Sequence, residues 1–303
     1  MQLLGTFTPI ATYDFNVTLD ILARYTHPTL DRVRDDAYWR VLHVDEALAL
    51  VCVKVHANDD LGVYLVDAKG TLDTQKLMLK MRHMLAIDEN PSGFYDYARH
   101  HPLLWKVVEP LVGVRLFRTA SVFEALAITT TEQQISWVAA QKAQRYLIEW
   151  GCHFIEHDGE RYYAFPTPSQ FAVATLADLK PTKITFRRMN ILVNVAGQVM
   201  AGALDLERLL TISPEEAYKA LVSIKGIGHW TAAWTLSRTL GQHNFVGYND
   251  VALQAAVNQY FYGKEGKIPE AQVTETFAQF GDYAGRAAHY TLMRLVLDRY
   301  EKR

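Results

Sequence analysis

Two glycines, Gly226 and Gly228, separate segments with helical character in the stretch Lys225-Gly226-Ile227-Gly228. Each glycine inside a helix costs roughly 1 kcal/mol relative to alanine, so the break serves either the chain path or a group that touches the backbone. Glycine permits a tight turn and leaves the amides free of side chains, and amides that point outward at a helix N-terminus bind phosphate. We therefore predict a phosphate-binding turn, with a plain corner between packed helices as the alternative.

A second chemical candidate is Asp250, a carboxylate at the predicted start of a helix, where the helix dipole favours the ionised form. Such a charge can stabilise positive charge that develops on a reacting group. Trp230 and Trp234 are four residues apart and share one helix face, and an indole attracts a cationic ring through its π-face. The alternatives are an ordinary Asp N-cap, with Asn249 as a competing cap, and tryptophans that fill a core.

Capping signals predict the helices that position these residues. Ser213 is a good N-cap, Pro214 suits the first helical position and Glu216 completes a capping box. The first helix is expected over about 214–224. The second is expected to start near His229 and to stop at Gly241, together giving a hairpin over 214–241.

Ile224 and Ile227 are expected to anchor the turn between these helices in the core, while both glycines face outward.

Composition and charge favour a globular protein. Of the 303 residues, 50% are apolar or aromatic and 21% are charged, and the formal net charge is −2, which suits a full hydrophobic core. No apolar run approaches the length of a membrane span, and the N-terminus lacks the pattern of a signal peptide. The two cysteines, Cys52 and Cys152, argue for a reducing compartment and against a disulfide framework. We therefore expect a cytoplasmic protein with no membrane partner.

The first ninety residues suggest a mixed unit. Residues 38–57 and 61–68 are rich in Val, Leu and Tyr, flank the turn signal at 58–62 and suggest an antiparallel pair. Residues 73–87 show helical spacing of apolar side chains and should pack on that sheet. These side chains are Leu77, Leu79, Met81, Met84 and Leu85. The breaker at 88–93 marks the expected domain boundary, which gives an α+β N-terminal domain over 1–90.

Helical patterning dominates the predicted second domain, 91–303. The segments with apolar stripes are 121–128, 132–151, 168–179, 187–202, 214–224, 231–240, 250–261 and 285–300. Residues 152–168 interrupt them with a predicted hairpin and loop. Cys152, His153 and His157 lie there, but three such residues in a hairpin are usually ordinary polar side chains that face water, and His229 has no evident partner. We therefore predict neither a catalytic metal nor an organic cofactor.

Several ordered motifs resemble the helix-hairpin-helix DNA glycosylase superfamily, in particular its 3-methyladenine DNA glycosylase II, or AlkA-type, branch. Residues 221–234 resemble the hairpin, and Asp250 follows 22 residues after Gly228, at the distance of the superfamily's aspartate. Residues 112–143, 164–172 and 188–209 resemble further elements of the branch. The likeness covers most of the chain from about Asp88 onward. It implies a mainly α, two-lobed glycosylase domain with a cleft between the lobes.

The resemblance implies a role for each candidate residue. Asp250 would be the catalytic carboxylate, and Trp230, Trp234 and Tyr248 would line the pocket for a base rotated out of the duplex. Gln134 would fill the gap left in the stack, with a local helix-start contact as its alternative. The DNA-binding set would comprise Lys225, Gly226, Ile227, Gly228, His229, Thr231, Gln133, Gln134 and Ser136.

The sequence also differs from the bifunctional members of the superfamily, which carry a lysine two residues after the second hairpin glycine. Trp230 occupies that position, and an indole cannot form a Schiff base with the sugar. A further difference is Gly247-Tyr248, where relatives often have a proline before the aspartate.

The function that the resemblance implies is that of a monofunctional DNA glycosylase, which excises alkylated purines of the 3-methyladenine type from damaged duplex DNA and leaves an abasic site. The expected oligomeric state is a monomer. The alternatives are a glycosylase of the same fold for deaminated or oxidised purines, and a helix-hairpin-helix DNA-binding protein without catalysis.

Overall fold

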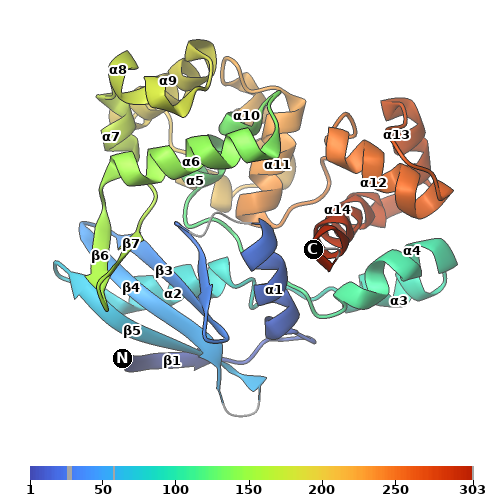
Figure 1. Cartoon of the computed structure of the whole chain (residues 1–303), viewed down its shortest axis with the longest axis horizontal. Helices are drawn as coiled ribbons and strands as arrows, with labels where there is room; N and C mark the ends of the chain where they lie inside the picture. The colour runs from blue at the N-terminus through green and yellow to red at the C-terminus, as the bar shows by residue number, and fades with distance from the viewer. Residues whose placement is uncertain (26–28, 57–58, 302–303) are drawn as a thin grey trace.

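The N-terminal part of the chain forms a five-stranded antiparallel sheet with the order β1-β5-β4-β3-β2 (Figure 1). The computed structural model describes residues 1–25, 29–56 and 59–301. The strands are β1 (Gln2–Phe7), β2 (Arg32–Arg34), β3 (Ala37–Val44), β4 (Ala47–Val55) and β5 (Leu61–Lys69). The pairing of β4 with β5 confirms the predicted antiparallel pair.

The predicted strand region 38–57 is in fact a hairpin of its own, because the chain reverses at Asp45, which has a φ of 50°. The turn signal at 58–62 begins at Asn58, which lies outside the described residues.

The two faces of the sheet are covered by different elements. The side chains of α1 (Phe15–Tyr25) and α2 (Thr74–Met84) share one apolar cluster with β3, β4 and β5. The hairpin of β6 (Phe154–His157) and β7 (Glu160–Tyr163) packs on the other face. The helix expected over 73–87 is therefore confirmed as α2, but the assignment of Leu79 to its buried face is wrong, since this side chain is 68% exposed.

The first helical lobe encloses a single apolar cluster. Its helices are α5 (Val122–Glu132), α6 (Trp137–Gly151), α7 (Pro168–Ala172), α8 (Leu176–Leu179), α9 (Phe186–Met200), α10 (Pro214–Ser223) and α11 (His229–Leu240). The helix expected over 132–151 begins only at Trp137, because Ser136 caps it. The segment 168–179 forms two short helices instead of one, each with its own threonine cap.

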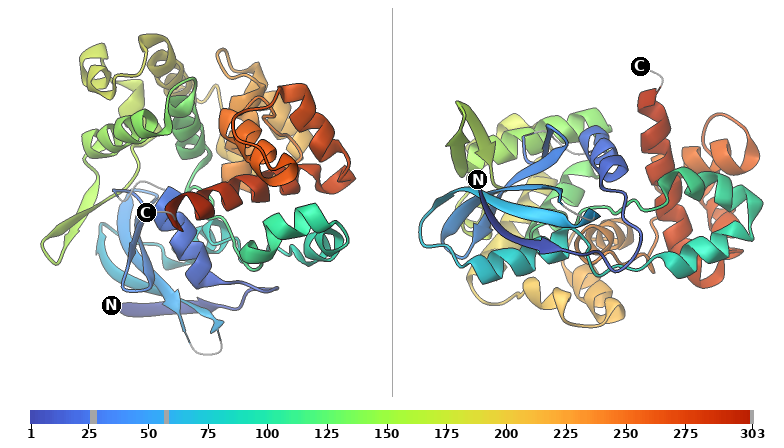
Figure 2. Two further views of the ribbon diagram at one scale, coloured as in Figure 1. Left: turned by 45° about the vertical axis from the view of Figure 1, so that its right-hand side comes forward. Right: turned by 90° about the horizontal axis from the view of Figure 1, so that it is seen from below.

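The second helical lobe combines segments from both sides of the first. Its helices are α3 (Ser92–Arg99), α4 (Pro102–Val108), α12 (Val251–Tyr262), α13 (Glu270–Ala278) and α14 (Ala284–Glu301). Figure 2 shows α3 and α4 lying along α14, far from it in sequence. The sequence analysis did not predict α3, α4 or α13. The α+β unit followed by a mainly helical two-lobed part confirms the predicted fold class, while the bounds 1–90 and 91–303 stay a prediction.

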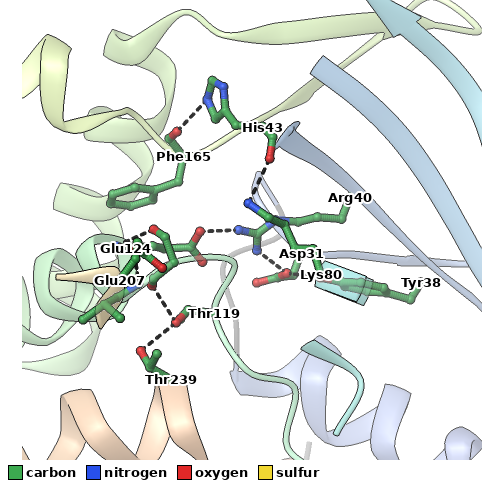
Figure 3. A network of polar contacts seen from close by, with 12 residues as sticks. Asp31, Tyr38, Arg40, His43, Lys80, Thr119, Glu124, Phe165, Glu207 and Thr239 are labelled. Carbon is green, nitrogen blue, oxygen red and sulfur yellow. Dashed lines mark hydrogen bonds and ion pairs between the residues drawn. The ribbon is translucent and has the colours of Figure 1, made fainter. Parts of the chain in front are cut away.

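A buried polar network joins the sheet to the first lobe (Figure 3). Arg40 on β3 donates to Glu124 on α5 at 2.7 Å and also to Asp31. The side chains of Arg40 and Glu124 are only 2% and 3% exposed. Burial lowers the pKa of Arg40, but Asp31 and Glu124 outweigh it, so that the guanidinium pKa lies above its usual value. The ion pairs thus keep a permanent charge inside the protein.

Two partly buried histidines make the stability of the fold depend on pH. Burial lowers the pKa of His43 to about 4, and that of His243 to about 3 with help from Arg286 and Arg118. The unfolded chain binds protons on these rings below about pH 6.5 while the folded protein does not, so stability falls on acidification by up to about 1.4 kcal/mol per pH unit for each ring.

We expect the urea midpoint to fall from pH 7 to pH 5, and to fall less in a His243→Asn variant. Equal falls in the variant and the unmodified protein would contradict the contribution of His243.

Among the described residues, every helix is too short or too polar to span a lipid bilayer.

Candidate functional site

The helix-hairpin-helix consists of α10, a turn and α11. Ser213 and Glu216 form the predicted capping box, in which each side chain accepts from the other residue's backbone amide. The second helix begins at His229 and ends at Gly241, whose φ of 64° lies in the left-handed region. The start of α11 at His229 and its cap at Gly241 agree with the predicted positions, because capping signals act within a few residues.

The two hairpin glycines face different surroundings. Gly226 has a φ of 96°, and a Cβ there would lie 2.5 Å from Cδ1 of Ile191 on α9. Both glycines are exposed, as expected, but the side of Gly226 on which a Cβ would project is occupied by Ile191. Apart from Gly228 itself and its chain neighbours, no described atom lies within 4 Å of a Cβ built on Gly228, which directly precedes α11. Ile227 is buried, as expected, while Lys225 is exposed.

Asp250 divides its two oxygens between two tasks. It is the N-cap of α12, where Oδ1 accepts from the amides of Ala252 and Leu253 at 2.8 and 2.9 Å. Its Oδ2 accepts from the indole Nε1 of Trp230 at 3.0 Å. The carboxylate is half-buried. The capping interpretation is thus correct, and it leaves one oxygen directed at the hairpin helix.

The two tryptophans lie edge to face on α11, with ring centroids 6.5 Å apart. Gly247 lies against them, since a Cβ there would be 2.7 Å from Cδ1 of Trp230 and 3.3 Å from Nε1 of Trp234. A side chain at this position would push the rings aside. Gly247 also accepts the amide of Asp250 at 2.8 Å, so a single turn carries the carboxylate and touches both indoles.

A cavity of about 10 Å³ lies beneath Trp234. Its lining comes from α11, α14 and the segment between α11 and α12. The Nε1 of Trp234 and the Nδ1 of His289 are buried there without a hydrogen-bond partner in the described part of the chain. Tyr248 turns instead to the second lobe, where its ring stacks on Phe277 at 6.2 Å, and burial raises its pKa.

The turn between α5 and α6 lies against α11. Gln133 donates to the hydroxyl of Thr231 at 2.8 Å, and Arg188 donates to the carbonyl of Gln133. Thr231 is only 3% exposed, so its side chain supports Gln133 from within the protein. Gln134 has a φ of 51° in this turn and is not at a helix start. Ser136 caps α6 by accepting the amide of Ala139.

His229 is not without partners, contrary to the sequence analysis. Its Nδ1 lies 2.8 Å from the hydroxyl of Tyr218, and its Nε2 lies 2.8 Å from the carbonyl of Val246. Tyr218 and Phe245 stack at 4.1 Å with an interplanar angle of 8°. The sequence analysis did not single out Tyr218 or Phe245, because only the folded chain brings these separate segments together.

Among the described residues, no group of three or more His, Cys, Asp or Glu side chains is placed to hold a metal ion. Cys152 is exposed, and His153 lies next to His43, with 3.2 Å between Nδ1 and Nε2.

Comparisons with known proteins relate the whole chain to one group. No family model matches the sequence. The DNA-3-methyladenine glycosylase of Bacillus subtilis is 27% identical over 244 residues, which cover 80% of each chain. The DNA-3-methyladenine glycosylase 2 of Escherichia coli is 25% identical over 227 residues, 73% of this chain and 75% of its own.

Solved structures give the same fold. A 3-methyladenine DNA glycosylase from Archaeoglobus fulgidus superposes with a TM-score of 0.81 over 98% of both chains at 23% identity. An 8-oxoguanine glycosylase/lyase of Clostridium acetobutylicum in complex with double-stranded DNA superposes with a TM-score of 0.72 at 17% identity, over 95% of this chain and 93% of its own.

The α10–α11 hairpin and the aspartate that follows it thus lie in a fold shared with DNA glycosylases. The chain is similar in sequence to DNA-3-methyladenine glycosylases, including those of the AlkA type, and has the helix-hairpin-helix glycosylase fold.

Proposed function

We propose that the protein is a monofunctional DNA glycosylase that hydrolyses the N-glycosidic bond of alkylated purines in duplex DNA and leaves an abasic site. The observation that carries this proposal is the half-buried carboxylate of Asp250 bonded to the indole of Trp230. The names of the relatives from Bacillus subtilis and Escherichia coli support 3-methyladenine as the type of lesion.

Asp250 would act on the sugar. As the base departs, positive charge develops on the deoxyribose, and a fixed carboxylate stabilises it and can activate a water molecule. The amides of Ala252 and Leu253 hold Oδ1 at the N-terminus of α12. Trp230 orients Oδ2 through its N–H, so that the charge is held in place before the substrate arrives.

Trp230 and Trp234 would receive the base. Rotation of the nucleotide out of the stack is needed because the sugar and base are otherwise shielded. A cationic alkylated purine is a good leaving group and binds an indole face through cation–π attraction. Since the cavity beneath Trp234 holds only about 10 Å³, entry of a base requires the ring or the neighbouring Gly247 turn to move. Tyr248, partly buried against the apolar cluster of the second lobe, would form the more rigid side of the site.

The hairpin turn and the α5–α6 turn would bind the DNA backbone and the opened stack. The Ile227 amide donates to the Ile224 carbonyl at 3.0 Å. The amides at the start of α11, after Gly228, are therefore the ones that would bind a phosphate. Lys225 supplies a nearby positive charge. Gln134, at the tip of the α5–α6 turn, is our candidate for the side chain that fills the vacated stack.

The proposal is tested with duplexes that each carry one damaged base, scored for free base and for abasic sites. We expect release of 3-methyladenine-type purines and no covalent adduct on borohydride reduction, because Trp230 cannot form a Schiff base. If the protein released only hypoxanthine or 8-oxoguanine, its substrates would be deaminated or oxidised purines instead of alkylated ones. Binding without release from any lesion would favour the non-catalytic alternative, and a trapped adduct would contradict the monofunctional reaction. A monomeric state and a cytoplasmic location stay predictions.

A further inference from the structure

The segment between α11 and α12 carries Asp250, and its position depends on how the rest of the segment is held. Two of its contacts with the hairpin involve Phe245 and Val246. The ring of Phe245 stacks on Tyr218 of α10, and the carbonyl of Val246 lies 2.8 Å from Nε2 of His229 at the start of α11. Both helices of the hairpin therefore hold this segment.

The partners of His229 determine which nitrogen carries the proton. A carbonyl can only accept, so Nε2 bears the hydrogen and donates to Val246. In the neutral ring, Nδ1 has a lone pair that can accept the O–H of Tyr218, 2.8 Å away. The bonds then run in one direction, from Tyr218 through the imidazole to Val246, and such chains strengthen each bond by polarisation. A histidine occupied at both nitrogens has little left to offer a phosphate.

Short backbone bonds extend this chain from Val246 to the carboxylate. The same Val246 carbonyl accepts the amide of Tyr248 at 3.0 Å, and the Gly247 carbonyl accepts the amide of Asp250 at 2.8 Å. Gly247 itself lies against the ring of Trp230, whose N–H reaches Oδ2 of Asp250. A shift of Val246 would therefore move the carboxylate relative to its indole partner.

We infer that His229 is a positioning residue for Asp250 through Val246, and that its side chain is not a DNA contact. The inference rests on the proposed function. His229 is the first residue of α11 and directly follows the turn that would bind phosphate. One residue would therefore connect this DNA-binding turn to the position of Asp250 relative to the reacting sugar.

Two substitutions separate the two bonds of the ring. Gln places an amide nitrogen near the position of Nε2 and can still donate to Val246. Asn places its amide near Nδ1, where its oxygen can accept from Tyr218, but it is too short to reach Val246. We expect His229→Asn to lower the single-turnover excision rate by about 10- to 100-fold, since a displacement of about 1 Å costs up to that factor. His229→Gln should retain most of the rate, and duplex affinity should be the same in both. A substitution of the exposed histidine directly after α3, His100→Asn, serves as the matched control.

A DNA-contact role would appear differently. It predicts that both variants weaken duplex binding and reduce the salt dependence of the dissociation constant, and that Gln gives no rescue. Either result would overturn the inference, as would unchanged excision in His229→Asn.

Amide hydrogen exchange gives a readout that does not need activity. The amides of Tyr248 and Asp250 should exchange faster in His229→Asn than in His229→Gln, while the thermal midpoints of the two variants stay close. Equal exchange would overturn the positioning role even if the unmodified protein released no base. Absence of base release from the unmodified protein would refute the proposed function by itself, so the two failures are distinguishable.

Discussion

Replacing Asp250 by Asn is expected to abolish base release, with a fall of at least about a hundredfold in the single-turnover rate, as for the loss of a main electrostatic group in other active sites. The asparagine oxygen can still accept from Ala252 and Leu253, so the cap of α12 and the fold should persist. The charge that faces the sugar is lost, and the amide nitrogen meets the N–H of Trp230 without an acceptor. The measurement is excision at saturating enzyme, with duplex affinity measured in parallel.

The matched control for this substitution is Asp73→Asn. Asp73 caps α2 in the same way, by accepting from the amides of Gln75 and Lys76 at 3.0 Å each, but it lies in the N-terminal unit. Its replacement should leave excision unchanged and alter stability by about as much as Asp250→Asn does. Full turnover in the Asp250 variant would remove this carboxylate from the mechanism and with it the proposed function of the site.

The second large effect concerns stability. Replacing Arg40 by Met leaves the carboxylates of Glu124 and Asp31 without their buried partner (Figure 3). Loss of one member of a buried ion pair costs about 3–5 kcal/mol, because the remaining charge is neither hydrated nor compensated. We therefore expect the free energy of unfolding in urea to fall by that amount, and a second change, Glu124→Gln, to restore part of it.

The contrasting pair is Lys76 and Asp45, which form a salt bridge between side chains that are 58% and 60% exposed. Lys76→Met should cost less than about 1 kcal/mol, since water screens and replaces such a bond. A similarly small cost for Arg40→Met would show that the buried network does not hold the sheet on α5.

Local signals account for the parts of the fold that the sequence predicted well. The capping box at Ser213, the glycine that ends α11 and the cap at Asp250 act over a few residues, so the bounds of α10 and α11 and the start of α12 follow from them. The helices α3, α4 and α13 were missed because they are only 8, 7 and 9 residues long, too short to show a clear helical period. In addition, α3 and α4 pack in one cluster with α14, which lies far along the chain from them.

Long-range contacts explain the remaining errors at the site. The sequence gives no sign that Ile191 of α9 lies against Gly226, so this contact of an otherwise exposed glycine was not predicted. Likewise Tyr218, His229 and Val246 come from three separate elements, and only the fold shows that they form one chain of hydrogen bonds. The bond from Trp230 to Asp250 joins residues 20 positions apart, and residue type alone could not predict which oxygen would accept it.

The second lobe is assembled from the two ends of the helical region, α3 and α4 before the first lobe and α12 to α14 after it. During synthesis on the ribosome, α3 and α4 emerge more than a hundred residues ahead of their packing partners and must wait with apolar side chains uncovered. Asp250 itself belongs to the late-emerging part. A nascent or C-terminally truncated chain can therefore already contain the hairpin while it lacks the second lobe that holds the carboxylate of Asp250. The proposed site is complete only when the last helix has been made.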